Sequence, residues 1–324
     1  MIVAEGLTRS FGDTRAVRGV DFEVPEATVL GLLGPNGSGK TTIVRMLTTA
    51  LPPDSGTARV GGHDVVTEAG AVRPMIGLAG QYAAVDENLT GRENLEMVAR
   101  LYHLPRVEAR LRAAELLDRF DLADEAADRP VKTYSGGMRR RLDVAASLTS
   151  DPRVLFLDEP TTGLDPRSRQ TLWDVIEELV AAGTTVLLTT QYLEEADHLA
   201  DNIVVLDHGR VVAAGTPAEL KRRVGSSVLV LILTSEAMVP SAVAIVEESC
   251  GCRAEVSGTE ISVPVSGGPA MITRTLRGLE DAGVGLADIA VHEPTLDDVF
   301  LSLTTEDGFD GSGSSAPDTG GNGR

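Results

Sequence analysis

The chain has 324 residues, of which 42% are hydrophobic, so it is long enough for about two domains with buried cores. Its formal net charge of −19 and its aromatic content of 3% argue against a nucleic-acid-binding protein, which needs basic surface or stacking side chains. No apolar stretch approaches the roughly 18 residues that span a bilayer, and the N-terminus has no secretory pattern, so we expect no direct membrane insertion. Cys250 and Cys252 are the two cysteines, too few for a metal site and too close for an easy disulfide, so we expect a reducing, cytosolic compartment.

The first two thirds of the chain alternate strand and helix patterns. Apolar and β-branched runs predict strands, at 2–7, 17–24, 28–33, 154–157, 185–189 and 203–206. Hydrophobic periodicity predicts helices, at about 39–51, within 89–120, at 167–181 and at 193–200. This alternation predicts a largely parallel sheet covered on both faces, with a mainly helical insert between its strands.

The chain changes character near residue 225. Shorter strand and helix patterns follow, with strands at 228–233, 254–256 and 261–265 and helices at 270–282 and 296–303. The end of the chain is rich in glycine and acidic residues and almost free of apolar ones. The predicted organisation is a first domain over 1–224 with a helical subdomain at about 82–150, a small α+β domain over 225–305, and a disordered tail over 306–324.

A glycine-rich loop follows the strand at 28–33 and opens a helix. It fits the phosphate-binding pattern G-x-x-x-x-G-K-[ST], and its residues are Gly34, Pro35, Asn36, Gly37, Ser38, Gly39, Lys40, Thr41 and Thr42. Glycines let backbone N–H groups converge on phosphate oxygens, and the helix N-terminus adds a favourable dipole. We expect Lys40 to reach the β- and γ-phosphates of a nucleotide and the Thr41 hydroxyl to bind Mg²⁺.

A second apolar strand, at 154–157, ends in two acidic residues. Asp158 is placed for indirect coordination of Mg²⁺, the usual role of the acid at this position. Glu159 follows directly and can polarise an attacking water as a general base. Together with the phosphate loop, this pair predicts a site that hydrolyses a nucleoside triphosphate.

Between these two motifs lies Ser135-Gly136-Gly137, at the start of a predicted helix. In this order the three motifs resemble those of ATP-binding-cassette (ABC) ATPases, over residues 1 to about 222. The resemblance implies an α/β fold, with a P-loop ABC ATPase domain and helical subdomain followed by a small α+β C-terminal domain. It also implies ATP and Mg²⁺ as cofactors and an ATP-dependent homodimer, in which Ser135, Gly136 and Gly137 of one copy contact the nucleotide held by the other.

The resemblance carries further roles onto single residues. Phe11 stands where the family has an aromatic residue that stacks on adenine, usually tyrosine; the alternative is a core aromatic on a strand. Gln81 matches the glutamine that senses Mg²⁺ and the transporter, and is expected to take part in catalysis. The segment 163–165 matches a loop that crosses the dimer interface, and Asp165 is also a helix N-cap candidate. Gln191 replaces the histidine that contacts the γ-phosphate; its amide donates a hydrogen bond but carries no positive charge, so its effect on hydrolysis stays open.

Longer stretches narrow the resemblance. The segments 134–143, 189–197 and 293–300 resemble daunorubicin-resistance-type ATPases, which extends the likeness to about residue 303. Members of this group are separate ATPase subunits of drug or lipid exporters, so the resemblance implies a separate integral-membrane permease and a place at the cytoplasmic face of the cell membrane. We expect the permease to dock on residues 82–94, where the chain leaves Gln81 for the helical insert. The cargo does not follow from the resemblance.

A non-transport ABC ATPase that acts on ribosomes or DNA is the alternative. Ribosome-acting relatives usually carry two cassettes in one chain, and DNA-repair relatives insert a long coiled coil before the Ser-Gly-Gly motif. This chain has one cassette, and only 53 residues separate Gln81 from Ser135. Its negative net charge also argues against nucleic-acid binding, so the sequence favours the ATP-hydrolysing subunit of an exporter.

Overall fold

The computed structural model describes residues 1–80, 85–124, 126–224, 227–265 and 268–300. The chain divides into two compact units after Pro217. The boundary predicted from the sequence, between residues 224 and 225, lies at the end of α8 (Pro217–Val224). The assignment of domains stays a prediction, and the tail predicted over 306–324 lies outside the described residues.

The first unit is built on a six-stranded sheet. Five of its strands run parallel in the order β9-β3-β8-β7-β6, and β10 pairs antiparallel with β9 at one edge. The strands are β3 (Val29–Leu33), β6 (Ile76–Ala79), β7 (Val154–Asp158), β8 (Thr185–Thr190), β9 (Asn202–Asp207) and β10 (Arg210–Gly215). Every residue of β3, β7 and β8 is buried, which explains why these strands read as nearly continuous apolar runs.

Helices cover both faces of this sheet, as the sequence predicts. The helices are α1 (Lys40–Leu47) on one face and, on the other, α6 (Pro166–Ala181) and α7 (Leu193–Leu199). Leu30 and Leu32 of β3 share a core with Ile43 of α1. The intervening Gly31 faces the other way, where a Cβ atom would lie 3.2 Å from the Ala200 methyl group of the segment after α7. The alternation of side chains along β3 therefore separates the two layers.

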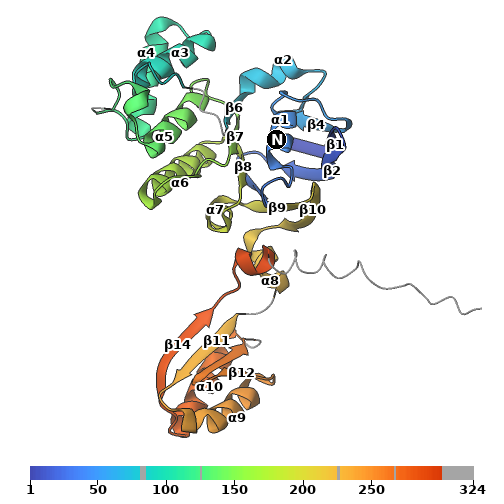
Figure 1. Cartoon of the computed structure of the whole chain (residues 1–324), viewed down its shortest axis with the longest axis vertical. Coiled ribbons are helices and arrows are strands. Elements are labelled where there is room, and N and C mark those ends of the chain that lie inside the picture. Colours follow the sequence, from blue (N-terminus) through green and yellow to red (C-terminus); the bar gives the residue numbers. More distant parts are fainter. Residues whose placement is uncertain (81–84, 125, 225–226, 266–267, 301–324) are drawn as a thin grey trace, which may run out of the picture. The chain divides into compact units, whose positions relative to one another are not determined.

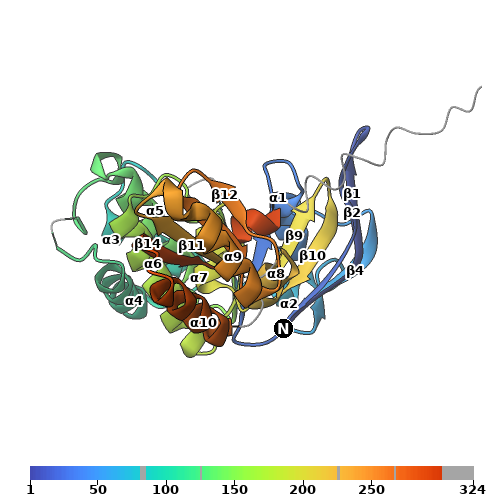
Figure 2. The same cartoon turned by 90° about the horizontal axis from the view of Figure 1, so that it is seen from below.

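A second, antiparallel sheet lies beside the first, in the order β2-β1-β4-β5. Its strands are β1 (Ile2–Phe11), β2 (Thr14–Val24), β4 (Ser55–Val60) and β5 (His63–Asp64), followed by the short helices α2 (Ala69–Val72) and η1 (Arg73–Met75). Figure 2 shows β1 and β2 as one long hairpin beside β4. Helix α1 contacts β2 and β4 of this sheet and β7 of the large sheet, so its N-terminus is fixed by both.

The helical insert is a separate group of helices on the far side of the large sheet from β1 and β2 (Figure 1). It contains α3 (Gly91–Leu101), α4 (Arg106–Arg119), η2 (Val131–Thr133) and α5 (Gly136–Ser147). A capping box starts α3, because the Thr90 hydroxyl accepts from the Glu93 N–H while the Glu93 carboxylate accepts from the Thr90 N–H. Helix α5 packs against β6 and α6, which joins the insert to the sheet.

The second unit contains a four-stranded antiparallel sheet in the order β12-β13-β11-β14. Its elements are β11 (Val228–Leu233), η3 (Glu236–Met238), α9 (Val239–Cys250), β12 (Glu255–Ser257), β13 (Glu260–Pro264), α10 (Gly268–Asp281) and β14 (Leu286–His292), with a helix over 296–300. Alternate residues of β11, from Leu229 to Leu233, are buried in a core with residues of α9 and α10. Cys250 and Cys252 are free thiols.

The elements missed by the sequence analysis lie mainly between residues 52 and 75, whereas β6 matches a strand expected at 76–80, before Gln81. Strand β4 buries only Ala58 and Val60 among its six residues, so it carries little apolar pattern. Strand β5 has two residues and α2 has four, lengths at which periodicity carries no signal. The hairpin β1–β2 is also longer than predicted, because its polar outer ends pair through the backbone.

Candidate active site

The phosphate loop connects β3 to α1 at the carboxyl edge of the large sheet, and its glycines are required by close backbone approaches. A Cβ atom on Gly34 would lie 2.3 Å from the Leu206 carbonyl oxygen, and one on Gly39 would lie 2.6 Å from the Ala16 carbonyl oxygen. Gly39 also has a φ of 108°, a conformation that side chains disfavour. The loop is therefore held between β9 and β2 with no room for larger residues at these two positions.

Lys40 is the first residue of α1, and its side chain is only 4% exposed. Its Nζ donates to the carbonyl oxygens of Gly34, at 2.7 Å, and Pro35, at 3.1 Å. The same Nζ lies 3.7 Å from Oε1 of Glu159. Burial lowers the pKa of Lys40, while the charges of Glu159 and Asp158 act in the opposite direction. The ammonium is thus already oriented along the loop, toward the place where phosphates would lie.

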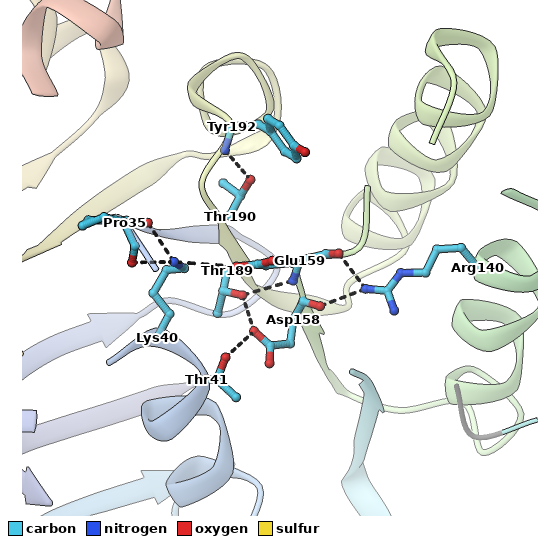
Figure 3. A network of polar contacts seen from close by, with 10 residues as sticks. Pro35, Lys40, Thr41, Arg140, Asp158, Glu159, Thr189, Thr190 and Tyr192 are labelled. Carbon is cyan, nitrogen blue, oxygen red and sulfur yellow. Dashed lines mark hydrogen bonds and ion pairs between the residues drawn. The ribbon is translucent and has the colours of Figure 1, made fainter. Parts of the chain in front are cut away.

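Three elements meet at the Asp158 carboxylate (Figure 3). Its Oδ1 accepts hydrogen bonds from Thr41 Oγ1 of α1, at 3.2 Å, and from Thr189 Oγ1 of β8, at 2.5 Å. Asp158 ends β7 and is 4% exposed, so the carboxylate is buried, and its Oδ1 accepts both of these hydrogen bonds. This arrangement places a hydroxyl and a carboxylate oxygen beside each other, the hard oxygen donors that Mg²⁺ prefers.

Glu159 follows Asp158 and turns sharply. Its φ is 51°, in the left-handed region that residues other than glycine rarely adopt. Its N–H donates to the Thr189 carbonyl oxygen, at 3.0 Å, and lies 3.1 Å from the Thr189 hydroxyl. This turn brings the Glu159 carboxylate to the Lys40 side of the site.

A cleft of about 530 Å³ opens over the phosphate loop. Its lining includes the predicted residues Phe11, Asn36, Gly37, Gly39, Lys40, Thr41, Thr42 and Glu159. Phe11 is 45% exposed and not part of the core, so its ring is available to a ligand. The Ser38 hydroxyl is buried and has no hydrogen-bond partner among the described residues, although it lies within the loop.

The cleft also contains basic residues that the sequence analysis missed. They are Arg15, Arg18 and His208. Arg15 and Arg18 belong to the β2 half of the long hairpin, and His208 lies in the turn between β9 and β10, so no local motif connects them to the loop. Arg15 and Arg18 stand four and seven positions after Phe11 in a chain of net charge −19. This local positive charge is the sequence feature that could have indicated an anion-binding cleft.

Ser135, Gly136 and Gly137, called here the signature residues, lie apart from this cleft. Ser135 is exposed and caps α5, where its Oγ accepts from the Met138 N–H at 3.2 Å. Gly136 is exposed as well, and a Cβ atom there would meet nothing within 4 Å. Gly137 is buried, with Ser168 Oγ 3.0 Å from the position of its missing Cβ atom. None of the three lines the cleft that holds Lys40.

Three predicted residues remain to be placed. Gln81 lies outside the described residues. Gln191 is exposed after the end of β8 and does not line the cleft. Asp165 caps α6, where its carboxylate accepts from the Ser168 N–H at 2.9 Å, and Pro166 is the first helical residue. Asp165 is therefore a helix N-cap, as predicted. The prediction that the segment 163–165 crosses a dimer interface stays untested.

No helix among the described residues combines the length and apolar character needed to cross a membrane.

Comparison with known proteins agrees with this geometry. The ABC transporter family profile matches residues 17–162. The chain is 53% identical to daunorubicin resistance ATP-binding protein DrrA3 of Streptomyces coeruleorubidus, over 94% of this chain and 96% of that protein. It is 52% identical to daunorubicin/doxorubicin resistance ATP-binding protein DrrA of Streptomyces peucetius, over 94% of this chain and 92% of that protein. A solved structure of an ATP-binding subunit of an ABC transporter superposes with a TM-score of 0.62 at 26% identity, over 69% of this chain and 92% of that one.

The fold, the motif order and these similarities agree along nearly the whole chain. The resemblance inferred from the sequence is confirmed, and so is the P-loop ABC ATPase fold. The chain is an ATP-binding, ATP-hydrolysing transporter subunit, and it belongs to the ABC transporter family, among the daunorubicin-resistance-type ATP-binding proteins.

Proposed function

We propose that this chain powers an exporter of drug-like or lipid-like molecules, by binding and hydrolysing Mg²⁺-ATP at the cleft over its phosphate loop. The observation that carries the proposal is the meeting of Lys40, Thr41, Asp158 and Glu159 at one edge of the sheet. These four side chains come from two distant segments, and each has the chemistry that phosphoryl transfer to water requires.

The donor set suits a magnesium ion. Among the described residues, no cluster of three or more His, Cys, Asp or Glu side chains is present, as a metal held by protein alone would require. Mg²⁺ in nucleotide sites takes only one or two protein oxygens, because phosphates and waters supply the others. Thr41 and Asp158 would hold it, with Gln81 as the further candidate; when bound, the ion neutralises charge on the phosphate oxygens.

Each protein group then has a separate task. Backbone N–H groups of the loop and the Lys40 ammonium bind phosphate oxygens, with Arg15 and Arg18 as further positive charge at the rim. Phe11 offers a ring face to adenine. Glu159 orients the attacking water and accepts its proton. Gln191, an amide where the family has histidine, would donate a hydrogen bond to the γ-phosphate.

We propose further that two copies form each complete site. Ser135 and Gly136 are exposed, while they do not line the cleft of their own chain. A head-to-tail homodimer would bring these residues of one copy to the nucleotide on the phosphate loop of the other. Closure with ATP and opening after hydrolysis would then be the movement that reaches the membrane.

The partner that receives this movement is a separate integral-membrane permease, which would hold the subunit at the cytoplasmic face of the membrane. Part of the docking segment predicted at 82–94 packs within the helical insert, because Val85 is only 9% exposed and Glu87 pairs with Arg139 at 3.0 Å. Residues 82–84 lie outside the described residues, so the docking of this segment stays a prediction. A groove of about 580 Å³ between β6, the end of α3 and α5 is a second candidate for the docking surface, and residues 85–94 are not part of its lining. Its lining includes Leu78, Leu101 and Tyr102, which are 43%, 72% and 40% exposed.

This groove fits a short apolar segment of the permease. Leu78 stands three residues before Gln81, so a segment seated there would lie next to the strand that leads to the nucleotide. Asp86, which is exposed nearby, would meet basic residues that membrane proteins carry on their cytoplasmic loops. The alternative of a ribosome- or DNA-acting ATPase is not favoured, because the relatives that cover this chain are named resistance proteins.

Transport in inside-out membrane vesicles tests the proposal. Vesicles that contain this chain and its permease should take up daunorubicin when Mg²⁺-ATP is added, and vesicles with Lys40→Ala should not. Leu101→Glu should abolish vesicle binding of the subunit while the isolated subunit still binds ATP. Sedimentation of the chain with ribosomes, without ATP-dependent uptake of any of a panel of drugs and lipids, would instead support the alternative.

A further inference from the structure

Three consecutive arginines, Arg139 to Arg141, lie near the start of α5, one residue after Ser135-Gly136-Gly137, and their side chains contact different elements. Arg139 pairs with Glu87 at 3.0 Å, within the helical insert. Arg141 donates to the Phe120 carbonyl oxygen at 2.8 Å, at the end of α4. Arg140 points instead toward the large sheet, because successive residues of a helix are about 100° apart around its axis.

The Arg140 guanidinium binds the ends of two neighbouring strands. It donates to the carbonyl oxygens of Asp158, at 2.8 Å, Glu159, at 2.7 Å, and Pro160, at 2.8 Å, all of which lie at or just after the end of β7. It also donates to the Gly80 carbonyl oxygen, just after β6. Its side chain is 13% exposed, and Asp143 lies 3.5 Å away as a counter-charge. One largely buried side chain therefore donates to four backbone carbonyls, as Figure 3 shows for those of Asp158 and Glu159.

These contacts matter because the backbone of Glu159 is strained. Its φ of 51° is left-handed, and the following Pro160 further disfavours helical conformations at this position. Such a conformation persists only where the surroundings hold it on both sides. The Glu159 N–H is held by Thr189, at 3.0 Å, and its carbonyl oxygen is held by Arg140. Without Arg140, the carbonyl side of the turn would keep only the longer hydrogen bond from the Thr162 N–H, at 3.4 Å.

We propose that Arg140 is a positioning residue for hydrolysis. Its guanidinium holds the Glu159 backbone in the left-handed turn, and thereby holds the Glu159 carboxylate on the side of Lys40, where the attacking water must lie. Arg140 touches neither nucleotide nor water in this role. It acts only through the carbonyls of the segment 158–160.

The same contacts join the two sites of a dimer, a step that rests on the proposed head-to-tail homodimer. Ser135 caps the helix on which Arg140 lies, and it faces the nucleotide of the other copy. A shift of α5 caused by that nucleotide moves the guanidinium, and the Glu159 turn of its own chain follows. Arg140 thus makes the general base of one site sensitive to the occupation of the other.

Steady-state hydrolysis and nucleotide affinity, measured on the same purified variants, test the positioning role. Arg140→Gln should lower kcat by about 10- to 100-fold, the loss expected for a misplacement of about 1 Å, and should leave the Kd for ATP within about threefold. Arg140→Lys should recover part of the rate, because a single ammonium has three donors and no fork to span two strands. Arg141→Gln is the matched control, since Arg141 is 12% exposed and also binds a backbone carbonyl, and it should keep the wild-type kcat.

Mixed dimers, purified through two different tags, test the coupling. When one site is silenced by Lys40→Ala, Arg140→Gln can be placed either in the chain that provides Glu159 to the remaining site or in the chain that provides Ser135. We expect the larger loss of kcat in the first placement. In the second placement kcat should be kept, because the Glu159 that this Arg140 positions belongs to the silenced site, whereas the ATP affinity of the remaining site should fall by about two- to fivefold, because coupling between binding sites is reciprocal. No change of ATP affinity in the second placement would refute the coupling and leave the positioning role. Equal losses of kcat in both placements, or a loss of kcat only in the second, would overturn the positioning role.

Two further outcomes separate this proposal from the proposed dimer. If a mixture of Ser135→Arg and Lys40→Ala chains regains no activity although mixed dimers are recovered, the two-chain site fails, and the coupling fails with it. The homogeneous Arg140→Gln protein still reports on positioning in that case. Equal losses of kcat, ATP affinity and melting temperature in Arg140→Gln and Arg141→Gln would show that the arginine is only structural.

Discussion

The phosphate-loop side of the first unit is buried and internally hydrogen-bonded, whereas the signature loop of the same unit is exposed. Lys40 and Asp158 are each 4% exposed and make hydrogen bonds to neighbouring elements. Ser135 and Gly136 are exposed, and the Ser135 hydroxyl caps the helix within its own turn by accepting from the Met138 N–H.

The difference suits two separate tasks, the binding of a nucleotide and the reversible contact with another chain. A site that binds a highly charged ligand gains from groups that are oriented beforehand, because little reorganisation is then needed on binding. A surface that must engage and release another chain in every cycle gains from being accessible and self-contained. Arg140 joins these two regions, since it lies on the signature helix and binds the end of β7.

The largest effect is expected at the most constrained residue of the phosphate side. Glu159→Gln should lower kcat by about 10²- to 10⁴-fold, because the amide cannot accept the proton of the attacking water. ATP should still bind, since Lys40 and Thr41 are unchanged. Hydrolysis rates and equilibrium binding of a fluorescent ATP analogue check both parts. Near-normal hydrolysis would remove Glu159 from its proposed role.

Complementation between chains tests whether the exposed Ser135 of one copy completes the nucleotide site of the other copy. Ser135→Arg and Lys40→Ala should each be inactive as homogeneous proteins. Mixed in equal amounts, they should regain about a quarter of the wild-type rate, because half of the dimers are mixed and each has one intact site of two. A mixture of Lys40→Ala with Glu159→Gln is the control, because both changes affect the phosphate side; its mixed dimers contain no intact site and should stay inactive.

Two glycine substitutions sharpen the contrast in packing. Gly34→Ala should destabilise the protein by about 1–3 kcal/mol, because its Cβ atom would overlap the Leu206 carbonyl oxygen. Gly136→Ala should leave stability unchanged or raise it by up to about 1 kcal/mol, since alanine favours the helix and nothing lies within 4 Å. It should nevertheless lower kcat if the partner's nucleotide approaches this glycine. Urea denaturation and hydrolysis assays separate the two effects.

Local backbone demands explain which parts of this site could be predicted from the sequence. The phosphate loop can be predicted residue by residue, because its glycines, lysine and threonine form one sequence pattern over nine consecutive positions. Asp158 and Glu159 were predictable for a related reason, as an apolar strand that ends in two acids has few other readings. The alternating pattern also predicted the parallel sheet, since β3, β7 and β8 are buried on both faces.

The parts that were missed depend on long-range packing. Nothing in a run of three arginines ranks Arg140 above its neighbours, because the ranking depends on where α5 lies relative to the ends of β6 and β7. Arg15 reaches the cleft only because the hairpin β1–β2 passes beside the loop. The register of that hairpin is set by backbone pairing, which leaves little trace in side-chain pattern.

The smallest expected effect concerns a buried acid behind the phosphate side. Glu195 is 1% exposed, and burial raises the pKa of its carboxyl above the ordinary value of 4.5. Thr161, Thr190 and Trp173 surround it and oppose the rise, but no partner among the described residues reaches it with good hydrogen-bond geometry. A buried carboxylate with such partners is held more easily as the neutral acid.

The sign of the pH dependence follows from this rise. The folded state binds the Glu195 proton more tightly than the unfolded chain, so this contribution to stability is complete below about pH 4.5 and is lost as the pH rises through the raised pKa. Glu195→Gln removes the titration, and the variant should therefore gain stability relative to wild type as the pH rises from 5 to 8. Glu194→Gln is the control, since its exposed carboxylate pairs with Arg169 at 3.3 Å and should show no such trend. Urea denaturation across this pH range measures both, and a gap between Glu195→Gln and wild type that stays constant would mean that Glu195 keeps its charge in the folded protein.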